Sequence, residues 1–328
     1  MAAHDDTVIE LREQGKTYAE IASMLGITEK QVNHAIDRKR KKKNKIEFED
    51  MKEYSEEDIE SFIQATIELQ EKRDKLNTKQ TKVNICLDES KPVAVAFWGD
   101  WHIGGVGTDH KRFEQDLRKI RDTEGLYFIG SGDYKDNYIT HVHPGSQYEQ
   151  IIQPGMQDIA VQHYIKQVKE KSLALIRGCH DDWDMKGVNR DFVDELCTIT
   201  MSPNLWHGGE VNIKLGDTSY LWRCRHKFPF QSSLNLENAM RRINEFQGPC
   251  DVAMEGHLHN AYFIKRHLMG EYRVMGRTGT YKVWDEYGQK LAGYKGKYGI
   301  PVVIMHPKKN MMVEFLDNAI PILEGLRA

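Results

Sequence analysis

Four short polar motifs, each placed directly after an apolar run, constrain this chain more than any other feature. They are Gly-Asp-Trp-His at 99–102, Gly-Asp-Tyr-Lys-Asp at 132–136, Gly-Cys-His-Asp at 178–181 and Gly-His-Leu-His at 256–259. The apolar runs are typical of buried strands, and open α/β sheets bind ligands beyond the carboxyl ends of their strands. Carboxylates and imidazoles are ligands for ions such as Zn, Mn and Fe. The motifs therefore predict one metal site built from distant parts of the chain.

The chain from residue 91 onward alternates strand-like and helix-like segments before it becomes rich in strands. Strands are predicted at 93–98, 126–129, 173–176, 211–215, 220–224 and 252–254, and helices at 110–121, 156–171, 189–197 and 236–246. Further strands are predicted at 261–265, 272–275, 281–284, 301–306 and 311–316. This order favours a four-layer α/β/β/α sandwich, in which helices flank two packed sheets.

Residues 1–45 are predicted to form a small all-α helix-turn-helix module. Thr17 with Glu20, and Thr28 with Gln31, are capping boxes that open its second and third helices, and Gly26 lies in the turn. The spacing resembles the helix-turn-helix of resolvases and terminases. The candidate DNA-binding residues are Lys30, Gln31, Arg38, Lys39, Arg40 and Lys41. The alternative is a helical bundle used for oligomerisation.

A charged connector, residues 46–90, is predicted between this module and a main domain at 91–328. A basic run at 38–45 precedes an acidic stretch at 46–58, and clustered Lys and Arg can neutralise phosphates of a nucleic acid. A helix is predicted over 55–76, with a partial apolar stripe, and a short strand over 83–87. DNA is therefore the expected partner.

The composition argues against a membrane or secreted protein. No stretch has the apolar length of a membrane span, and the N-terminal residues lack a signal-peptide pattern. The five cysteines are scattered, without C-x-x-C spacing, which is typical of reduced thiols rather than of a disulfide framework. We therefore expect a cytoplasmic protein without a membrane partner.

The four motifs resemble those of the calcineurin-like metallophosphoesterase superfamily, whose pattern is D-x-H, G-D-x-x-D, G-N-H-D/E, a later His and G-H-x-H. The resemblance covers about residues 91–316 in the same order and implies two divalent ions, Mn, Zn or Fe. It implies a first ion bound by Asp100, His102, Asp133 and His259, and a second bound by Asp133, His226 and His257. His226 is assigned because it follows the strand at 220–224; His207 is the alternative.

The same resemblance implies that His180 is the catalytic imidazole and that Asp181 orients it. One position departs from the family pattern, because Cys179 stands where the family has Asn. A thiolate is a softer ligand than an amide oxygen, so Cys179 either ligates the second ion or leaves that position to water. Further candidates for supporting the ligands or binding substrate are Asp136, Asn137, His141, His143 and Arg177.

The predicted reaction is hydrolysis of a nucleic-acid phosphodiester by a metal-bridging hydroxide, because a DNA-binding module raises the local concentration of such a substrate. The domain resembles the nuclease branch of the superfamily, and the pairing of domains resembles phage-encoded phosphoesterases, which would place the protein in a host cytoplasm. Alternatives are a phosphatase or phosphodiesterase acting on nucleotides, cyclic phosphates or phosphoproteins, a non-catalytic DNA-binding regulator with a degenerate metal site, and a structural protein that uses the metals as a staple.

Overall fold

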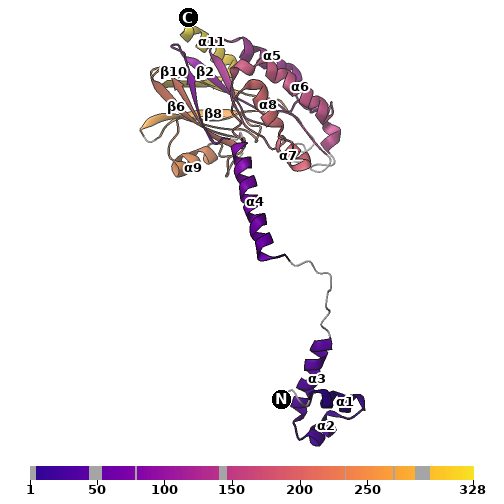
Figure 1. The fold of residues 1–328 in the computed structure, drawn as a ribbon. Helices are drawn as coiled ribbons and strands as arrows, with labels where there is room; N and C mark the ends of the chain where they lie inside the picture. The colour runs from indigo at the N-terminus through magenta and orange to yellow at the C-terminus, as the bar shows by residue number, and fades with distance from the viewer. Residues whose placement is uncertain are drawn as a thin grey trace. The chain divides into compact units, whose positions relative to one another are not determined.

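The computed structural model describes residues 5–43, 54–77, 80–139, 146–232, 234–268, 270–284 and 296–328. The chain divides into two units, Met1–Leu76 and Asn77–Ala328, whose ribbons are drawn in Figure 1. Among the helices that these ranges contain, none is long and apolar enough to cross a bilayer.

The first unit holds three short helices and a longer one. The short helices are α1 (Asp5–Glu13), α2 (Tyr18–Leu25) and α3 (Glu29–Lys43), and they enclose a small apolar core. Both predicted capping boxes are formed, and Gly26 ends α2 in the left-handed conformation, with φ of 62°. The longer helix, α4 (Glu56–Lys75), begins after a capping box at Ser55, close to the predicted boundary.

Two sheets form the second unit. The five-stranded sheet has the order β11-β10-β2-β3-β4, and the six-stranded sheet has the order β1-β5-β6-β7-β9-β8. The strands of the first are β2 (Val93–Trp98), β3 (Leu126–Gly130), β4 (Ser172–Leu175), β10 (Pro301–His306) and β11 (Asn310–Phe315). Those of the second are β1 (Lys82–Leu87), β5 (Gly208–Leu215), β6 (Thr218–Arg225), β7 (Val252–Glu255), β8 (Tyr262–Leu268) and β9 (Glu271–Arg277). Strands β2, β3 and β4 are parallel to one another, as are β6 and β7.

Helices cover the outer faces of both sheets (Figure 1). The five-stranded sheet packs on α5 (His110–Asp122), α6 (Pro154–Gln167), α8 (Phe192–Thr200) and α11 (Leu316–Arg327). The six-stranded sheet packs on α9 (Asn238–Gln247). The other helical segments within the described ranges of this unit are α7 (Asp182–Val188) and two short 3₁₀ turns, η1 (Ser146–Glu149) and η2 (Lys169–Lys171).

Alternation along β2 shows how the sequence builds these layers. Val95 and Phe97 join the core between the two sheets, whereas Ala96 and Trp98 join the core under the helices, because successive strand residues point to opposite faces. All four side chains are fully buried, since the strand is covered on both sides. The predicted four-layer α/β/β/α sandwich is thereby confirmed.

Several predicted boundaries in the second unit are wrong. The unit begins before residue 91, because β1, which we had predicted as a strand of the connector, pairs with β5 along its whole length. Residues 281–284 are not a strand, and Lys282 makes only a single bridge to Thr108. The helix predicted at 189–197 starts later, as α8, and α7 and α11 were not predicted. Pro321 lies inside α11 and argued against a helix there.

Candidate metal centre

The predicted ligands lie just beyond the carboxyl ends of five strands. Asp100 follows β2, Asp133 follows β3, His180 follows β4, His226 follows β6 and His257 follows β7. Backbone bonds hold these segments side by side: the N–H of Asp100 donates to the carbonyl of Gly132, and the N–H of Gly256 donates to the carbonyl of His226. The topology therefore gathers residues from 100 to 259 at one place.

The first group of donor atoms contains Asp100, His102, Asp133 and His259. One nitrogen or oxygen of each lies within 4.8 Å of the others. Nε2 of His102 and Nε2 of His259 face each other at 3.0 Å, and Nε2 of His259 lies 3.3 Å from Oδ1 of Asp100. Three members are buried, and the side chain of His259 is 20% exposed. These are the four residues assigned to the first ion, and their donor set suits a divalent transition metal.

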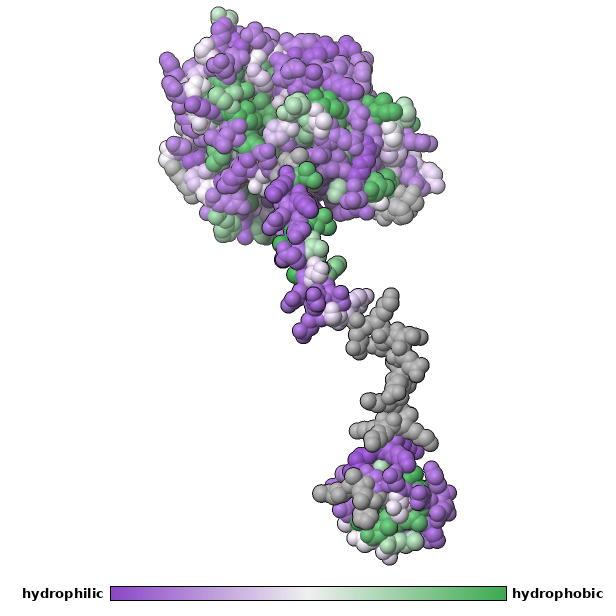
Figure 2. Space-filling view, in the orientation of Figure 1, coloured by the Kyte–Doolittle hydropathy of each residue, from purple (hydrophilic) through white to green (hydrophobic). Residues whose placement is uncertain are grey.

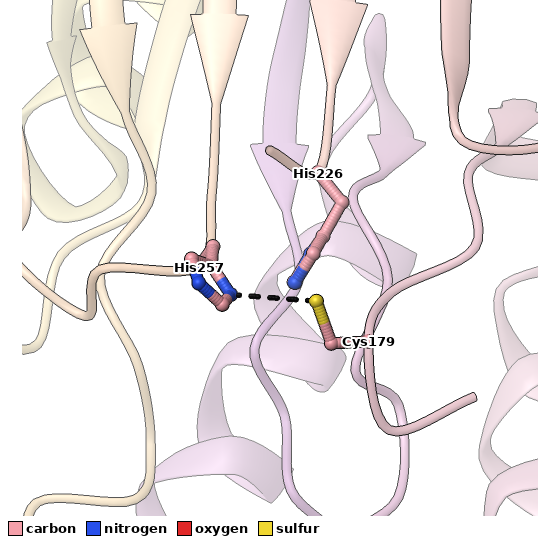
Figure 3. A group of neighbouring side chains, drawn as sticks. All are labelled: Cys179, His226 and His257. Atoms are coloured by element: carbon pink, nitrogen blue, oxygen red, sulfur yellow. Dashed lines mark hydrogen bonds between the residues drawn. The ribbon is translucent and has the colours of Figure 1, made fainter. Parts of the chain in front are cut away.

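The second group contains Cys179, His226 and His257, and Figure 3 shows the three side chains converging from separate segments. Sγ of Cys179 lies 3.6 Å from Nδ1 of His257. His207, the alternative to His226, instead packs its ring against Trp206, with ring centroids 5.4 Å apart. The structure thus places His226, and not His207, with the donor atoms of this group.

A single carboxylate oxygen joins the two groups. Oδ2 of Asp133 lies 3.9 Å from Nε2 of His102 and 3.2 Å from Nε2 of His226. Burial opposes the charge on Asp133, but the neighbouring His226 and His180 outweigh it and hold the pKa of Asp133 well below the usual carboxyl range. A carboxylate in this position can bind two ions at once.

Hydrogen bonds fix the orientation of two of the ligand imidazoles. Nδ1 of His102 donates to Oδ1 of Asp136 at 3.2 Å, and Nδ1 of His226 donates to the carbonyl of Ser131 at 2.8 Å. Because these partners are acceptors, the proton of each ring lies on Nδ1, and Nε2 is left to bind a metal. Asp136 therefore contacts the ring of a candidate ligand. This arrangement fits a site for divalent ions.

The backbone of the site adopts the left-handed region at several residues other than glycine. Asp100, His102, Asp133, His257 and His259 have φ between 47° and 75°. Each such residue costs of order 1–3 kcal/mol, so the surrounding contacts must enforce these angles. Such strained backbone is typical of functional sites, because it points side chains in directions that a relaxed strand end does not allow.

Two glycines let the motif loops approach each other. Gly132 has φ of 92°, and a Cβ atom there would lie 2.3 Å from the backbone nitrogen of Gly178. A Cβ atom on Gly178 would lie 2.1 Å from Oδ1 of Asp133. No larger residue fits either position without moving the bridging carboxylate.

His180 is held beside both donor groups by contacts that differ from our prediction. Its backbone N–H donates to Oδ1 of Asp133 at 2.8 Å, and its Nδ1 donates to the backbone carbonyl of Asp136. Its ring packs against Trp183 with centroids 4.0 Å apart. Burial lowers the pKa of His180 to about 4. We had predicted that Asp181 orients this imidazole. The group that does so is the backbone carbonyl of Asp136.

Asp181 instead ties two motif loops together. Its carboxylate accepts hydrogen bonds from the backbone N–H groups of Asp133, Tyr134 and Gly178, at 2.8, 3.2 and 2.8 Å. Burial, reinforced by the charge of Asp133, raises the pKa of Asp181 to about 7. Asp181 therefore positions the bridging carboxylate through the backbone rather than acting on the imidazole.

Sequence reasoning missed Lys282. Its Nζ donates to Oδ1 of Asp136 at 2.8 Å and lies 4.6 Å from the ring centroid of Tyr138, and the residue is buried. Asp136 thus bridges a buried cation and the His102 ring. The missed signal was a lysine inside an apolar stretch, which we had taken for a strand.

Two of the predicted supporting residues are buried and hydrogen-bonded within the fold. Arg177 pairs with Asp182 and Asp191, so its described contacts tie it to the loop that follows β4. Asn137 is buried, and its Nδ2 donates to the carbonyl of His180 and to Oδ1 of Asp184. It supports the His180 loop. His141 and His143 lie outside the described residues.

The predicted DNA-binding residues fall on α3, with different surroundings. Gln31 caps that helix, Arg38 binds Asp5 at 2.8 Å and Lys39 lies 3.4 Å from Asp6. Lys30 and Arg40 are exposed, and neither has an ion-pair partner among the residues that the structure describes. Lys41 lies in the same helix, and its side chain is outside the described set. Among the candidates whose side chains the structure describes, Lys30 and Arg40 are therefore exposed cations without an ion-pair partner in the described ranges.

Comparisons with known proteins return solved structures only. No family model and no curated protein matches the chain. A Vps29 mutant from Entamoeba histolytica is 11% identical, with TM-score 0.38, over 68% of this chain and 99% of that one. A metallophosphoesterase from Sphaerobacter thermophilus is 14% identical, with TM-score 0.34, over 71% and 93%. A predicted phosphoesterase from Streptococcus pneumoniae is 11% identical, with TM-score 0.32, over 68% and 98%.

Proposed function

We propose that this chain is a metallophosphoesterase of the calcineurin-like type that hydrolyses phosphoester bonds with the help of two divalent ions. The observation that carries the proposal is the single Asp133 oxygen shared by two groups of donor atoms, with His180 beside both. Two ions held by such groups supply Lewis acidity at phosphorus and lower the pKa of bound water. Asp100, His102, Asp133 and His259 would hold one ion, and Asp133, His226 and His257 the other.

His180 supplies the proton-transfer group in this proposal. Its Nδ1 is engaged by the Asp136 carbonyl, so Nε2 is the atom available to a leaving-group oxygen. Its low pKa leaves the ring neutral at pH 7. A phosphate beside the ring raises that pKa, because a nearby negative charge favours the protonated imidazole. His180 can then carry a proton when substrate is present and deliver it to the departing oxygen.

The substrate we propose is a phosphodiester in DNA. The support is the first unit, in which α2, the Gly26 turn and α3 have the form of a helix-turn-helix, and Lys30 and Arg40 are exposed on α3. A nucleic-acid-binding unit in the same chain raises the concentration of substrate near the metal centre. The active-site residues themselves do not select DNA over a smaller phosphodiester.

The deciding experiment measures hydrolysis by Mn- and Zn-loaded protein on single- and double-stranded DNA, RNA, nucleotides, cyclic nucleotides, a phosphopeptide and an aryl phosphodiester. Turnover of DNA above the small esters supports the whole proposal. Turnover confined to small esters or the phosphopeptide retains the phosphoesterase and rejects the DNA substrate. Bound metal without turnover of any substrate rejects catalysis.

Deleting residues 1–45 should weaken DNA binding by at least about 10-fold at low salt and flatten its salt dependence, because fewer phosphates are neutralised. Fluorescence anisotropy at several salt concentrations measures both effects. The variant Lys30→Ala/Arg40→Ala should reproduce part of the loss. The matched control, Lys111→Ala/Lys166→Ala, removes two exposed charges from the second unit and should change little. If the deletion left DNA binding unchanged, residues 1–45 would not be the DNA-binding part of the chain.

Replacing Cys179 with Asn should shift metal preference from Zn toward Mn by at least about 10-fold, because an amide oxygen is a harder ligand than a thiolate. Calorimetric titration with each metal measures the ratio. Cys86→Ser, at an exposed cysteine outside the donor groups, is the control and should leave the ratio unchanged. An unchanged ratio in the Cys179 variant would show that its sulfur is not a ligand.

A further inference from the structure

Helix α4 carries an apolar face that no described residue covers. It has 20 residues and none of them is buried. The exposed apolar side chains on and just after it are Ile59, Phe62, Ile63, Ile67, Leu69 and Leu76. Apolar side chains appear as green atoms among polar ones along this helix in Figure 2. Phe62 is 73% exposed and Leu69 is 67% exposed.

These apolar residues share one side of the helix. At about 100° per residue, they fall within roughly half of the circumference. The same half also holds Thr66, Gln70, Arg73 and Asp74, and the opposite half carries polar and charged residues together with Ala65. A helix of this length with no tertiary contact is marginal in water, since most helical stability comes from burying such a face. Contiguous exposed apolar residues mark an interaction surface.

The charges of α4 indicate which partner fits. Its first turn is acidic, with Glu56, Glu57 and Asp58, and its last turn is basic, with Lys72, Arg73 and Lys75. We propose that α4 pairs with α4 of a second copy of this chain in antiparallel orientation. The acidic end of each helix then faces the basic end of the other, whereas a parallel pair would set like charges side by side.

The antiparallel arrangement also matches the apolar positions. Phe62 and Leu69 lie equally far from the two ends of α4, so complete overlap of the helices sets Phe62 of one copy level with Leu69 of the other. Asp58 and Lys72 lie two heptads apart on the same flank of the apolar face. In an antiparallel pair, residues on this flank of the two helices come close enough to form ion pairs. One self-complementary surface thus accounts for the apolar face and for the charge polarity. This inference does not depend on the proposed activity.

Sedimentation equilibrium of the full chain tests the proposal. We expect a reversible dimer of twice the 38.0 kDa chain mass, and a weakening of at least about 100-fold in the variant Phe62→Glu/Leu69→Glu, which keeps good helix formers on the helix. The control, Gln64→Glu/Ala65→Glu, adds two negative charges to the polar face and should retain the dimer. A monomer at every concentration, or a dimer that survives Phe62→Glu/Leu69→Glu, would overturn the proposal.

Orientation is tested by reversing the basic end. Lys72→Glu/Arg73→Glu sets acidic residues against the acidic turn of the antiparallel partner, so dimerisation should weaken by at least about 10-fold at low salt and less at high salt. Lys75→Glu, on the polar side of the same turn, controls for the loss of favourable charge at the helix C-terminus. In a parallel pair the double change replaces one like-charge contact with another, and an unaltered dimer would therefore rule out the antiparallel arrangement.

Discussion

Replacing Asp133 with Asn is expected to lower metal occupancy and to reduce turnover by at least about 10³-fold, the largest effect of any single substitution here. Oδ2 of Asp133 lies near both Nε2 of His102 and Nε2 of His226, at 3.9 and 3.2 Å. An amide offers one oxygen and no charge, so one of the two ions loses a ligand and both lose compensation for their charge. Metal analysis of the purified protein and initial rates of phosphodiester hydrolysis measure the two losses.

A buried aspartate outside the site provides the control for Asp133→Asn. Asp116 is fully buried, and its Oδ2 accepts hydrogen bonds from Tyr281 and Tyr298, which an amide oxygen can still receive, whereas Arg112 and Lys119 lose the acceptor Oδ1. Asp116→Asn should keep its metal even if the protein becomes less stable, and thermal unfolding separates the two effects. If Asp133→Asn remained fully loaded, the bridging role would be wrong, whatever the rate.

The sequence predicted the positions of the strand ends because polar motifs directly follow buried apolar strands. Val93–Trp98 is covered on both faces, so its run of apolar residues is unbroken, and the polar motif that follows stands out. The same contrast marks β3, β4 and β7. The chain order of the motifs then sufficed to predict that Asp100 and His257 meet, although 157 positions separate them. Strands β2 and β7 belong to different sheets, so the meeting of Asp100 and His257 follows from the packing of the two sheets on each other.

Other parts of the site could not be read from the sequence, because they depend on contacts between distant backbones. Asp181 follows the imidazole directly, which suggested a contact between the two side chains. Its carboxylate instead accepts from two backbone N–H groups at the left-handed turn of Asp133 and from the N–H of Gly178. Lys282 lies 146 residues from Asp136, its partner, and no local pattern links them. Contacts of this kind arise only when the chain has folded.

Replacing His180 with Ala is expected to reduce turnover by about 10²–10⁴-fold while both ions remain bound. The ring of His180 belongs to neither of the two groups assigned to the ions, although its backbone N–H steadies Asp133 and is retained in the variant. Metal analysis should therefore match the unmodified protein, in contrast to Asp133→Asn. Loss of metal from His180→Ala would place this ring among the ligands.

The identity of the leaving group tests what His180 does. A sugar alkoxide needs a proton to depart, whereas a nitrophenolate leaves as the anion, so removing a proton donor should cost far more with DNA than with a nitrophenyl phosphodiester. Trp183→Phe, which keeps an aromatic ring beside His180, should lower both rates by a similar factor, because it disturbs the position of the imidazole without removing its proton. Equal losses on both substrates in His180→Ala would assign His180 to substrate positioning, and a loss confined to DNA would assign it to proton transfer at the departing oxygen.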